Sequence, residues 1–422
     1  MRYIFPGYVE HYEENGVIYI LSRLKQNKVE ITDCELQEEF ASLSRNNGCQ
    51  EIATPLTQFL HEQELLVSYK EINLALNQAK ELLSEKLLLT IMPTEACNFR
   101  CLYCYETHEP IMMERPIIKQ IHSYIEEQSP FFKEVCISWF GGEPTLRKDI
   151  ILETADLVKK LQLRHGFRYS SSMTTNGYLL DVETFKQYYS GGIRYYQITL
   201  DGWSHDKTRP LTSGKGTLRT ILKNLVDISN LPKTDFQFCI TLRNNVLLDN
   251  EDLSWYDYLK KIFGHDERFV VAVALVTDWG GTNVKGLNLI KKEQKRQIRT
   301  RHEEYLDRIG LARKSKEKTL LSNICYASCP NGLVFRADGR IEKCTISLDN
   351  PKNLVGRVEP KDGVILDTVA TRKWCSSVIN PQCYTCADVL SCLNICCRKR
   401  VVIDGESEDI CICEHEEMAL EG

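Results

Sequence analysis

Cysteine is the residue whose number and spacing in this 422-residue chain point most directly to chemistry. The chain has 18 cysteines, and most of them lie from Cys325 onward, which is too uneven for a disulfide framework. The first residues have no apolar run like that of an export signal, so we expect a cytoplasmic protein with reduced thiols. Clustered cysteines in such a protein indicate metal binding.

Three of these cysteines form a compact group at Cys97, Cys101 and Cys104, separated by three and then two residues. Three thiolates on one short loop can hold three irons of a 4Fe-4S cluster and leave the fourth iron without a protein ligand. That open iron would be a place for chemistry. The alternative is a zinc loop with three thiolate ligands.

The remaining cysteines concentrate in a tail with little periodicity, which needs something other than a large apolar core to hold it. Metal binding would supply this, as iron–sulfur clusters or, alternatively, as zinc sites. Cysteines of this region that we consider as ligands are Cys325, Cys329, Cys344, Cys383, Cys386, Cys392, Cys396, Cys411 and Cys413.

The middle of the chain must position the first cysteine group, and there apolar strand-like runs alternate with amphipathic helical stretches. This alternation is typical of consecutive βα units around a parallel sheet. Six repeats are too few for a complete eight-fold barrel, so we predict an α/β fold built on a partial (β/α)6 TIM-like barrel. Its chemistry is expected at the C-terminal ends of the strands. The predicted strands cover residues 87–92, 135–140, 167–174, 195–200, 236–242 and 270–275.

Residues 1–85 read differently. Alternating residues flank Glu14, Asn15 and Gly16, which favours a hairpin turn. Helical stretches are predicted at 33–45 and 54–63, followed by a strand at 65–67. We predict three domains: a winged-helix-like module at 1–85, the barrel at 86–310 and the cysteine-rich domain at 311–422.

Composition excludes several classes of function. Lys and Arg number 53 against 58 for Asp and Glu, so no surplus of positive charge favours a nucleic-acid partner. The longest apolar run is too short to span a membrane, so no membrane partner is expected.

Short motifs follow the predicted strands in a defined order. Gly141, Gly142 and Glu143 end the second strand, and paired glycines with a carboxylate suit close approach to an ammonium group. Asn176 follows the third strand, and Thr199 ends the fourth, with Arg209 beyond it. The planar fork of an arginine can bind both oxygens of a carboxylate.

Together with Cys97, Cys101 and Cys104, these motifs resemble those of the radical S-adenosylmethionine (SAM) superfamily over residues 87–290. The resemblance implies that the three cysteines bind a 4Fe-4S cluster and that SAM binds its open iron. SAM would be cleaved to a 5′-deoxyadenosyl radical that abstracts hydrogen from the substrate. The residues implied to contact SAM are Tyr103, Gly142, Glu143, Asn176, Thr199, Arg209 and Leu275.

The tail resembles the seven-cysteine SPASM domain, which implies two auxiliary 4Fe-4S clusters. By position, the first would use Cys325, Cys329, Cys344 and Cys396, and the second would use Cys383, Cys386, Cys392 and Cys413. Cys325 lies upstream of the seven-cysteine pattern, so the first cluster could instead have an open iron. Cys411 competes with Cys413 as the last ligand.

This combination of domains resembles enzymes that modify ribosomally made peptides. The sulfatase-maturing branch has an acidic residue after the cysteine corresponding to Cys344, where this chain has Thr345. The resemblance implies that residues 1–85 bind the leader of a precursor peptide by strand addition, although they could instead be a structural cap. We predict a maturase that joins a cysteine sulfur to a carbon in a thioether crosslink, with an external electron donor of the flavodoxin or ferredoxin type. One alternative is an enzyme on the same scaffold that forms carbon–carbon crosslinks or makes some other radical modification. A second alternative is a non-catalytic, zinc-stabilised peptide-binding protein. No catalytic residue is identified.

Overall fold

The computed structural model describes residues 2–6, 9–22, 27–248, 252–278, 284–312, 325–375 and 399–405. Contacts divide the chain into two compact units, which are described separately. One comprises 1–84, 315–330 and 372–422, and the other comprises 85–314 and 331–371. No helix among the described residues is both long enough and apolar enough to cross a membrane.

The first unit begins with β1 (Tyr3–Ile4), β2 (Val9–Glu14), β3 (Val17–Ser22) and β4 (Lys28–Ile31). The β2–β3 hairpin turns at Asn15 and Gly16, whose φ angles of 53° and 74° are the positive values that the sequence predicts there. Strand β4 pairs with the other side of β3, so β3 is the centre of a three-stranded antiparallel sheet.

Two helices and a short strand follow, close to where the sequence places them. They are α1 (Cys34–Arg45), α2 (Pro55–Glu62) and β5 (Val67–Ser68), which pairs with β1. Asp33 caps α1 and Thr54 caps α2, because their side chains accept bonds from free backbone N–H groups of the first turn. Strand β5 begins two residues later than predicted, and α3 (Tyr69–Ser84) is a helix that the sequence reading missed.

All six predicted barrel strands are present in the second unit. Their bounds are β6 (Lys86–Ile91), β7 (Glu134–Trp139), β8 (Arg168–Thr175), β9 (Ile193–Thr199), β10 (Cys239–Val246) and β11 (Phe269–Leu275). They are mutually parallel and lie in chain order, so the carboxyl ends of all six lie along the same edge of the sheet. The prediction of an α/β fold with a large, mostly parallel sheet is confirmed.

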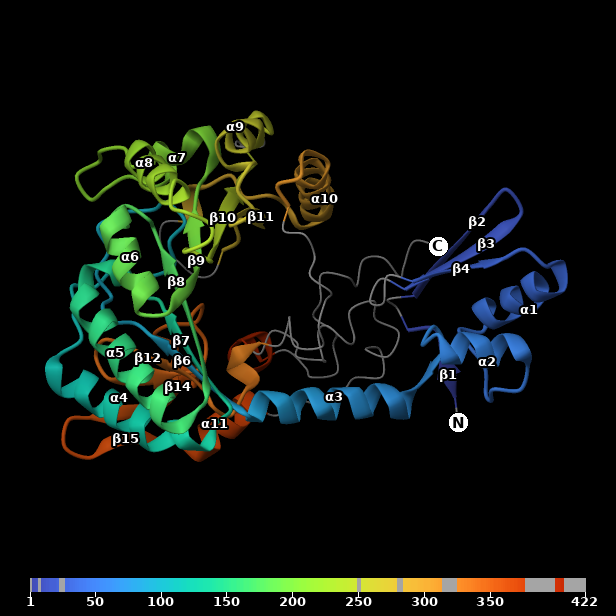
Figure 1. Cartoon of the computed structure of the whole chain (residues 1–422), viewed down its shortest axis with the longest axis horizontal. Coiled ribbons are helices and arrows are strands. Elements are labelled where there is room, and N and C mark those ends of the chain that lie inside the picture. The colour runs from blue at the N-terminus through green and yellow to red at the C-terminus, as the bar shows by residue number, and fades with distance from the viewer. Residues whose placement is uncertain are drawn as a thin grey trace. The chain divides into compact units, whose positions relative to one another are not determined.

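Helices connect these strands, and successive helices contact one another along the sheet (Figure 1). The connecting helices are α4 (Arg115–Gln128), α5 (Lys148–His165), α6 (Val182–Ser190), α7 (His205–Thr208), α8 (Leu218–Ser229), α9 (Ser254–Phe263) and α10 (Lys292–Ile309). Helix α4 shows why they pack: Ile117, Ile118, Ile121 and Ile125 recur at helical spacing and are all buried.

Part of the segment expected to form a separate C-terminal domain extends the barrel sheet instead. Strand β12 (Gly332–Phe335) pairs in parallel with β6, and β13 (Arg340–Glu342), β14 (Leu354–Glu359) and β15 (Gly363–Leu366) continue antiparallel. The sheet therefore has ten strands. Helix α11 (Thr368–Cys375) follows them.

A buried arginine joins this extension to the barrel. Arg336 is 1% exposed; its Nε donates to Glu95 Oε1 at 2.6 Å, and its Nη1 donates to Glu342 Oε1 at 3.1 Å. Glu95 follows β6, whereas Glu342 ends β13. Both carboxylates are buried, and Arg336 is the nearest cation to each; Arg340 lies farther from Glu342, at 3.8 Å.

We predict that Arg336→Ala lowers the free energy of unfolding by about 3–5 kcal/mol, because it leaves the buried Glu95 without its cation and Glu342 with only the more distant Arg340. Arg115→Ala is the matched control: Arg115 and its partners Asp149 and Glu153 are exposed, so the loss should be about 1 kcal/mol or less. Urea unfolding followed by circular dichroism measures both. Equal losses in the two variants would contradict this role of Arg336.

Candidate functional site

The cysteine loop leaves β6 and carries all three grouped thiols. Cys101 is buried, and Cys97 and Cys104 are half-buried. Burial raises the pKa of all three thiols, that of Cys97 to about 12. The thiols are therefore neutral near pH 7 unless a bound cation stabilises their thiolates.

Backbone bonds hold this loop against the segment that follows α7. Arg100 N donates to Pro210 O, and Leu102 N donates to Thr208 O, both at 2.9 Å. Thr212 N donates to Asn98 O at the same distance. The loop is thus fixed along most of its length, although it has no regular secondary structure between Cys97 and Cys104.

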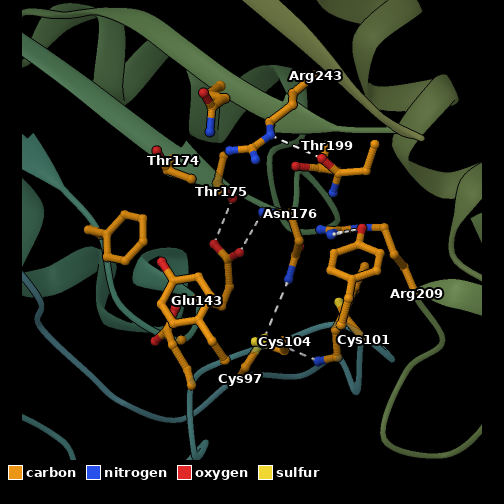
Figure 2. A pocket seen from close by; sticks show the side chains of 18 of the residues that line it. Cys97, Cys101, Cys104, Glu143, Thr174, Thr175, Asn176, Thr199, Arg209 and Arg243 are labelled. Carbon is orange, nitrogen blue, oxygen red and sulfur yellow. Dashed lines mark hydrogen bonds between the residues drawn. The ribbon is translucent and has the colours of Figure 1, made fainter. Parts of the chain in front are cut away.

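Glu143 lies at the centre of the site and is 1% exposed. Its Oε1 accepts bonds from Thr145 N (3.1 Å), Thr145 Oγ1 (2.6 Å) and Thr175 Oγ1 (2.6 Å). Its Oε2 accepts from Asn176 N at 2.7 Å. The carboxylate therefore joins the loops after β7 and β8, and only Oε2 has capacity for a further donor (Figure 2).

The two glycines before Glu143 allow the backbone to approach the cysteine loop closely. A Cβ at Gly142 would lie 2.3 Å from Ala96 O and 2.5 Å from Glu95 O. One at Gly141, whose φ is 110°, would lie 2.4 Å from Thr94 O. Only glycine fits either position.

Tyr103 links Arg209 to a second buried carboxylate, Asp201. Tyr103 donates to Asp201 Oδ2 at 2.6 Å and accepts from Arg209 Nη1 at 2.9 Å. Thr208 Oγ1 also donates to Asp201 Oδ2. Burial raises the pKa of the Tyr103 hydroxyl and, despite the nearby arginine, that of the Asp201 carboxyl. This network orders Tyr103 and Arg209 from two different loops.

One cavity of about 320 Å³ collects these groups at the carboxyl edge of the parallel strands. Every residue predicted to contact SAM lines it, and so do the three grouped cysteines. These residues are Cys97, Cys101, Tyr103, Cys104, Gly142, Glu143, Asn176, Thr199, Arg209 and Leu275. Figure 2 shows the cysteines on one side of the cavity, and dashed lines join Asn176 to Glu143 and to Cys97.

The cavity also contains polar residues that the sequence reading missed. Gln197 stands on β9 two residues before Thr199, and Arg243 and Asn245 stand on β10 with the same spacing. Arg243 Nε donates to Asn245 Oδ1 at 3.0 Å. Polar residues two apart near the end of an otherwise apolar strand share one face, and this signal could have revealed them. Other polar residues that line the cavity and were missed are Tyr105, Glu106, His108, Thr174 and Thr277.

The remaining predicted ligands are divided between the two units or fall outside the described residues. Cys325 and Cys329 lie in the first unit, where Cys325 packs against the core, and Cys344 lies in the second. Cys383, Cys386, Cys392, Cys396, Cys411 and Cys413 fall outside the described residues. Within the described ranges, no three His, Cys, Asp or Glu side chains are arranged to hold a single metal ion.

Comparison with known proteins agrees with the fold and the motifs. Residues 91–253 match the model of the Radical SAM superfamily. GTP 3′,8-cyclase of Campylobacter jejuni is 29% identical over 179 residues, which are 41% of this chain and 52% of the cyclase. Fe-coproporphyrin III synthase of Methanosarcina barkeri is 30% identical over 134 residues, 31% of each protein. The chain spans about half the length of the Campylobacter cyclases that it matches.

Two solved structures share the fold. The structure of anSMEcpe with bound AdoMet has a TM-score of 0.52 and 16% identity, covering 72% of this chain and 88% of that one. Streptococcus suis SuiB bound to precursor peptide SuiA has a TM-score of 0.52 and 13% identity, covering 94% of both chains. At these identities the likeness concerns the fold alone.

We predict that Gly142→Ala lowers the free energy of unfolding by about 1–3 kcal/mol and weakens SAM binding. The new methyl group would clash with two backbone carbonyl oxygens, which cannot move away as the end of a flexible side chain can. Gly286→Ala is the control, since a Cβ there meets nothing within 4 Å. Thermal unfolding and equilibrium dialysis with labelled SAM measure the two effects. Unchanged SAM affinity in the Gly142 variant would contradict the close approach described above.

Proposed function

We propose that this chain is a radical SAM enzyme that modifies a ribosomally synthesised precursor peptide. The observation that carries the proposal is the convergence of ten sequence-selected residues from six strands and loops on one cavity. These residues were selected by the order of their motifs along the chain. Ten residues without a shared function would not be expected to line a single cavity.

The residues around the cavity fit the two groups that such an enzyme requires. Cys97, Cys101 and Cys104 offer three soft thiol ligands on a rigid loop, and their raised pKa values mean that they need a cationic partner to ionise. The glycine backbone after β7 packs directly against the residues that precede the cysteine loop. When bound, a 4Fe-4S cluster with SAM would supply a 5′-deoxyadenosyl radical able to abstract hydrogen from the substrate.

The chain's own residues would bind SAM, orient it and shield it from water. Arg209 and Thr199 would hold the carboxylate of SAM, and Arg209 is already oriented by its bond to Tyr103. Glu143 would accept from the ammonium of SAM through Oε2, because Oε1 already accepts three bonds. Asn176 would reach the ribose, and Leu275 the adenine. Pre-oriented groups lose little entropy on binding.

A peptide substrate is supported by the first unit. Within the described residues, β2 and β4 each pair on one side only, so the sheet has open edges to which an extended peptide can add as a strand. SuiB, whose fold covers nearly the whole chain, is bound to a precursor peptide in its structure. We propose that residues 1–85 form a winged-helix-like leader-binding module.

We further propose that the product is a thioether crosslink and that the cysteine tail forms a SPASM domain with two auxiliary 4Fe-4S clusters. Concentration of thiols in the tail supports this, since each cluster takes four cysteine ligands. Carbon–carbon crosslinking is the nearest alternative on the same scaffold. Reduction of the enzyme would require an external one-electron donor.

We expect wild-type protein, reconstituted anaerobically with iron and sulfide, to be brown and to release 5′-deoxyadenosine from SAM with dithionite as reductant. A variant with Cys97→Ala, Cys101→Ala and Cys104→Ala should lose more than about 99% of this release, because the loop then has no ligand for the cluster. Cys136→Ala, which changes a cysteine outside the cavity, is the control. Chromatography quantifies the nucleoside; undiminished release by the triple variant would refute the assignment.

The substrate is tested with a candidate precursor peptide encoded beside the gene. After reaction with enzyme, SAM and reductant, each thioether should lower the peptide mass by two hydrogens and protect one cysteine from alkylation. The same peptide without its N-terminal leader should react at least about tenfold more slowly, because strand addition to the first unit is lost. Tandem mass spectrometry measures both; equal rates would contradict leader recognition, and a mass loss with free thiols would favour carbon–carbon crosslinking.

A further inference from the structure

A basic surface lies beside the cysteine loop, on the segment to which the loop is hydrogen-bonded. Residues 203–219 contain the exposed residues Lys207, Lys215 and Arg219, and Arg100 is exposed on the loop itself. This local positive charge contrasts with a net charge of −5 for the whole chain. A local patch of positive charge on a protein whose net charge is negative attracts negatively charged partners to that patch.

The same segment contains one acidic residue, Asp206, which offsets only one of the four positive charges. Asp206 Oδ1 accepts from Thr217 N at 2.7 Å and from Leu218 N at 2.8 Å, at the start of α8. The carboxylate is therefore committed to the N-terminus of that helix, where it is favourable.

Two exposed apolar side chains accompany the basic residues. Trp203 is 52% exposed and lies one helical turn before Lys207, while Gly202, His205 and Thr208 form the buried face of that turn. Trp203 is held in place, since its Nε1 donates to Ser254 Oγ at 3.0 Å and its ring contacts Trp255 edge-on. Leu102 is 40% exposed. A rigid, exposed tryptophan with a charged surround is typical of a protein-binding surface.

This surface is also close along the chain to the cavity that contains the cysteine thiols. Leu102 N is bonded to Thr208 O, and the residue before Leu102 is Cys101, whose side chain is buried and lines the cavity. The loop thus presents Leu102 to solvent and its neighbouring thiol to the site. An electron delivered at this surface need not pass through the part of the cavity where a substrate would lie.

We propose that the surface formed by Arg100, Leu102, Trp203, Lys207, Lys215 and Arg219 docks a small acidic protein that carries a one-electron redox group. The inference rests on the proposed function, because it names the partner that reduces that site. In the step, one electron leaves the reduced carrier and enters the iron–sulfur group that the cysteine loop would hold. The carrier is oxidised by one electron, and no bond is made or broken.

The test uses a purified flavodoxin as the acidic probe and two readouts. The first is its affinity for the full-length, cluster-loaded protein, measured by calorimetry with oxidised flavodoxin at low and high salt. Wild-type binding should weaken steeply with salt, and the Lys207→Glu, Lys215→Glu double variant should bind about tenfold more weakly at low salt. A Lys119→Glu, Lys160→Glu variant, with both changes on exposed positions of α4 and α5, carries the same charge change and should bind as wild type.

The second readout is 5′-deoxyadenosine release driven either by reduced flavodoxin or by dithionite. The Lys207, Lys215 variant should be slowed about tenfold with flavodoxin and remain within about twofold of wild type with dithionite, which needs no docking surface. Equal flavodoxin affinity in this variant and in wild type, or an equal loss with both reductants, would overturn the proposal. No release by wild type with dithionite would instead refute the proposed function, and the binding readout would still decide the docking surface.

Discussion

The buried carboxylate of Glu143 is the interaction on which the site most depends. A charged group at 1% exposure is tolerated only when donors replace its lost water, and here four donors do so. Hydrogen bonds to a charged group contribute about 1.5–3 kcal/mol each, so the loops after β7 and β8 cannot separate without a large loss. The position of Asn176 in the cavity is set by the same bonds, because its own N–H is one of the donors.

The same construction recurs around the cavity with other partners. Asp201 fixes Tyr103 relative to the segment after α7, and Arg336 fixes Glu95 relative to β13. Each pair joins residues far apart in the chain, and each is expensive to break because its members are buried. The cavity wall is therefore rigid before any ligand binds, which suits a site that must hold a reactive species in one orientation and exclude water.

The sequence predicted those strands, helices and turns that depend on local residue patterns. The apolar runs gave all six barrel strands to within a few residues, and the positive φ values at Asn15 and Gly16 follow from residue type. Helix α3 was missed although Ser68 and Glu71 form a reciprocal capping pair, a signal readable from the Ser-x-x-Glu spacing. The pairing of β12 with β6 could not be predicted from local sequence patterns, because it joins residues more than 240 positions apart. The site residues were found where a family motif named them, whereas Arg243 and Gln197 belong to no such motif and depend on which strand face lines the cavity.

The cysteine loop shows how one irregular segment can serve two purposes. Its backbone N–H groups at Arg100 and Leu102 bond outward to Pro210 and Thr208, which replaces the secondary structure that the loop lacks. Cys97 Sγ accepts from Phe99 N at 3.3 Å, but the bonds to the neighbouring segment use backbone atoms only, so the thiols remain available as ligands. Successive residues then take opposite environments, as Cys101 at 7% exposure and Leu102 at 40% illustrate. A loop held only by its thiols would collapse without metal, whereas this one is held by carbonyls of a neighbouring segment and presents its ligands already oriented.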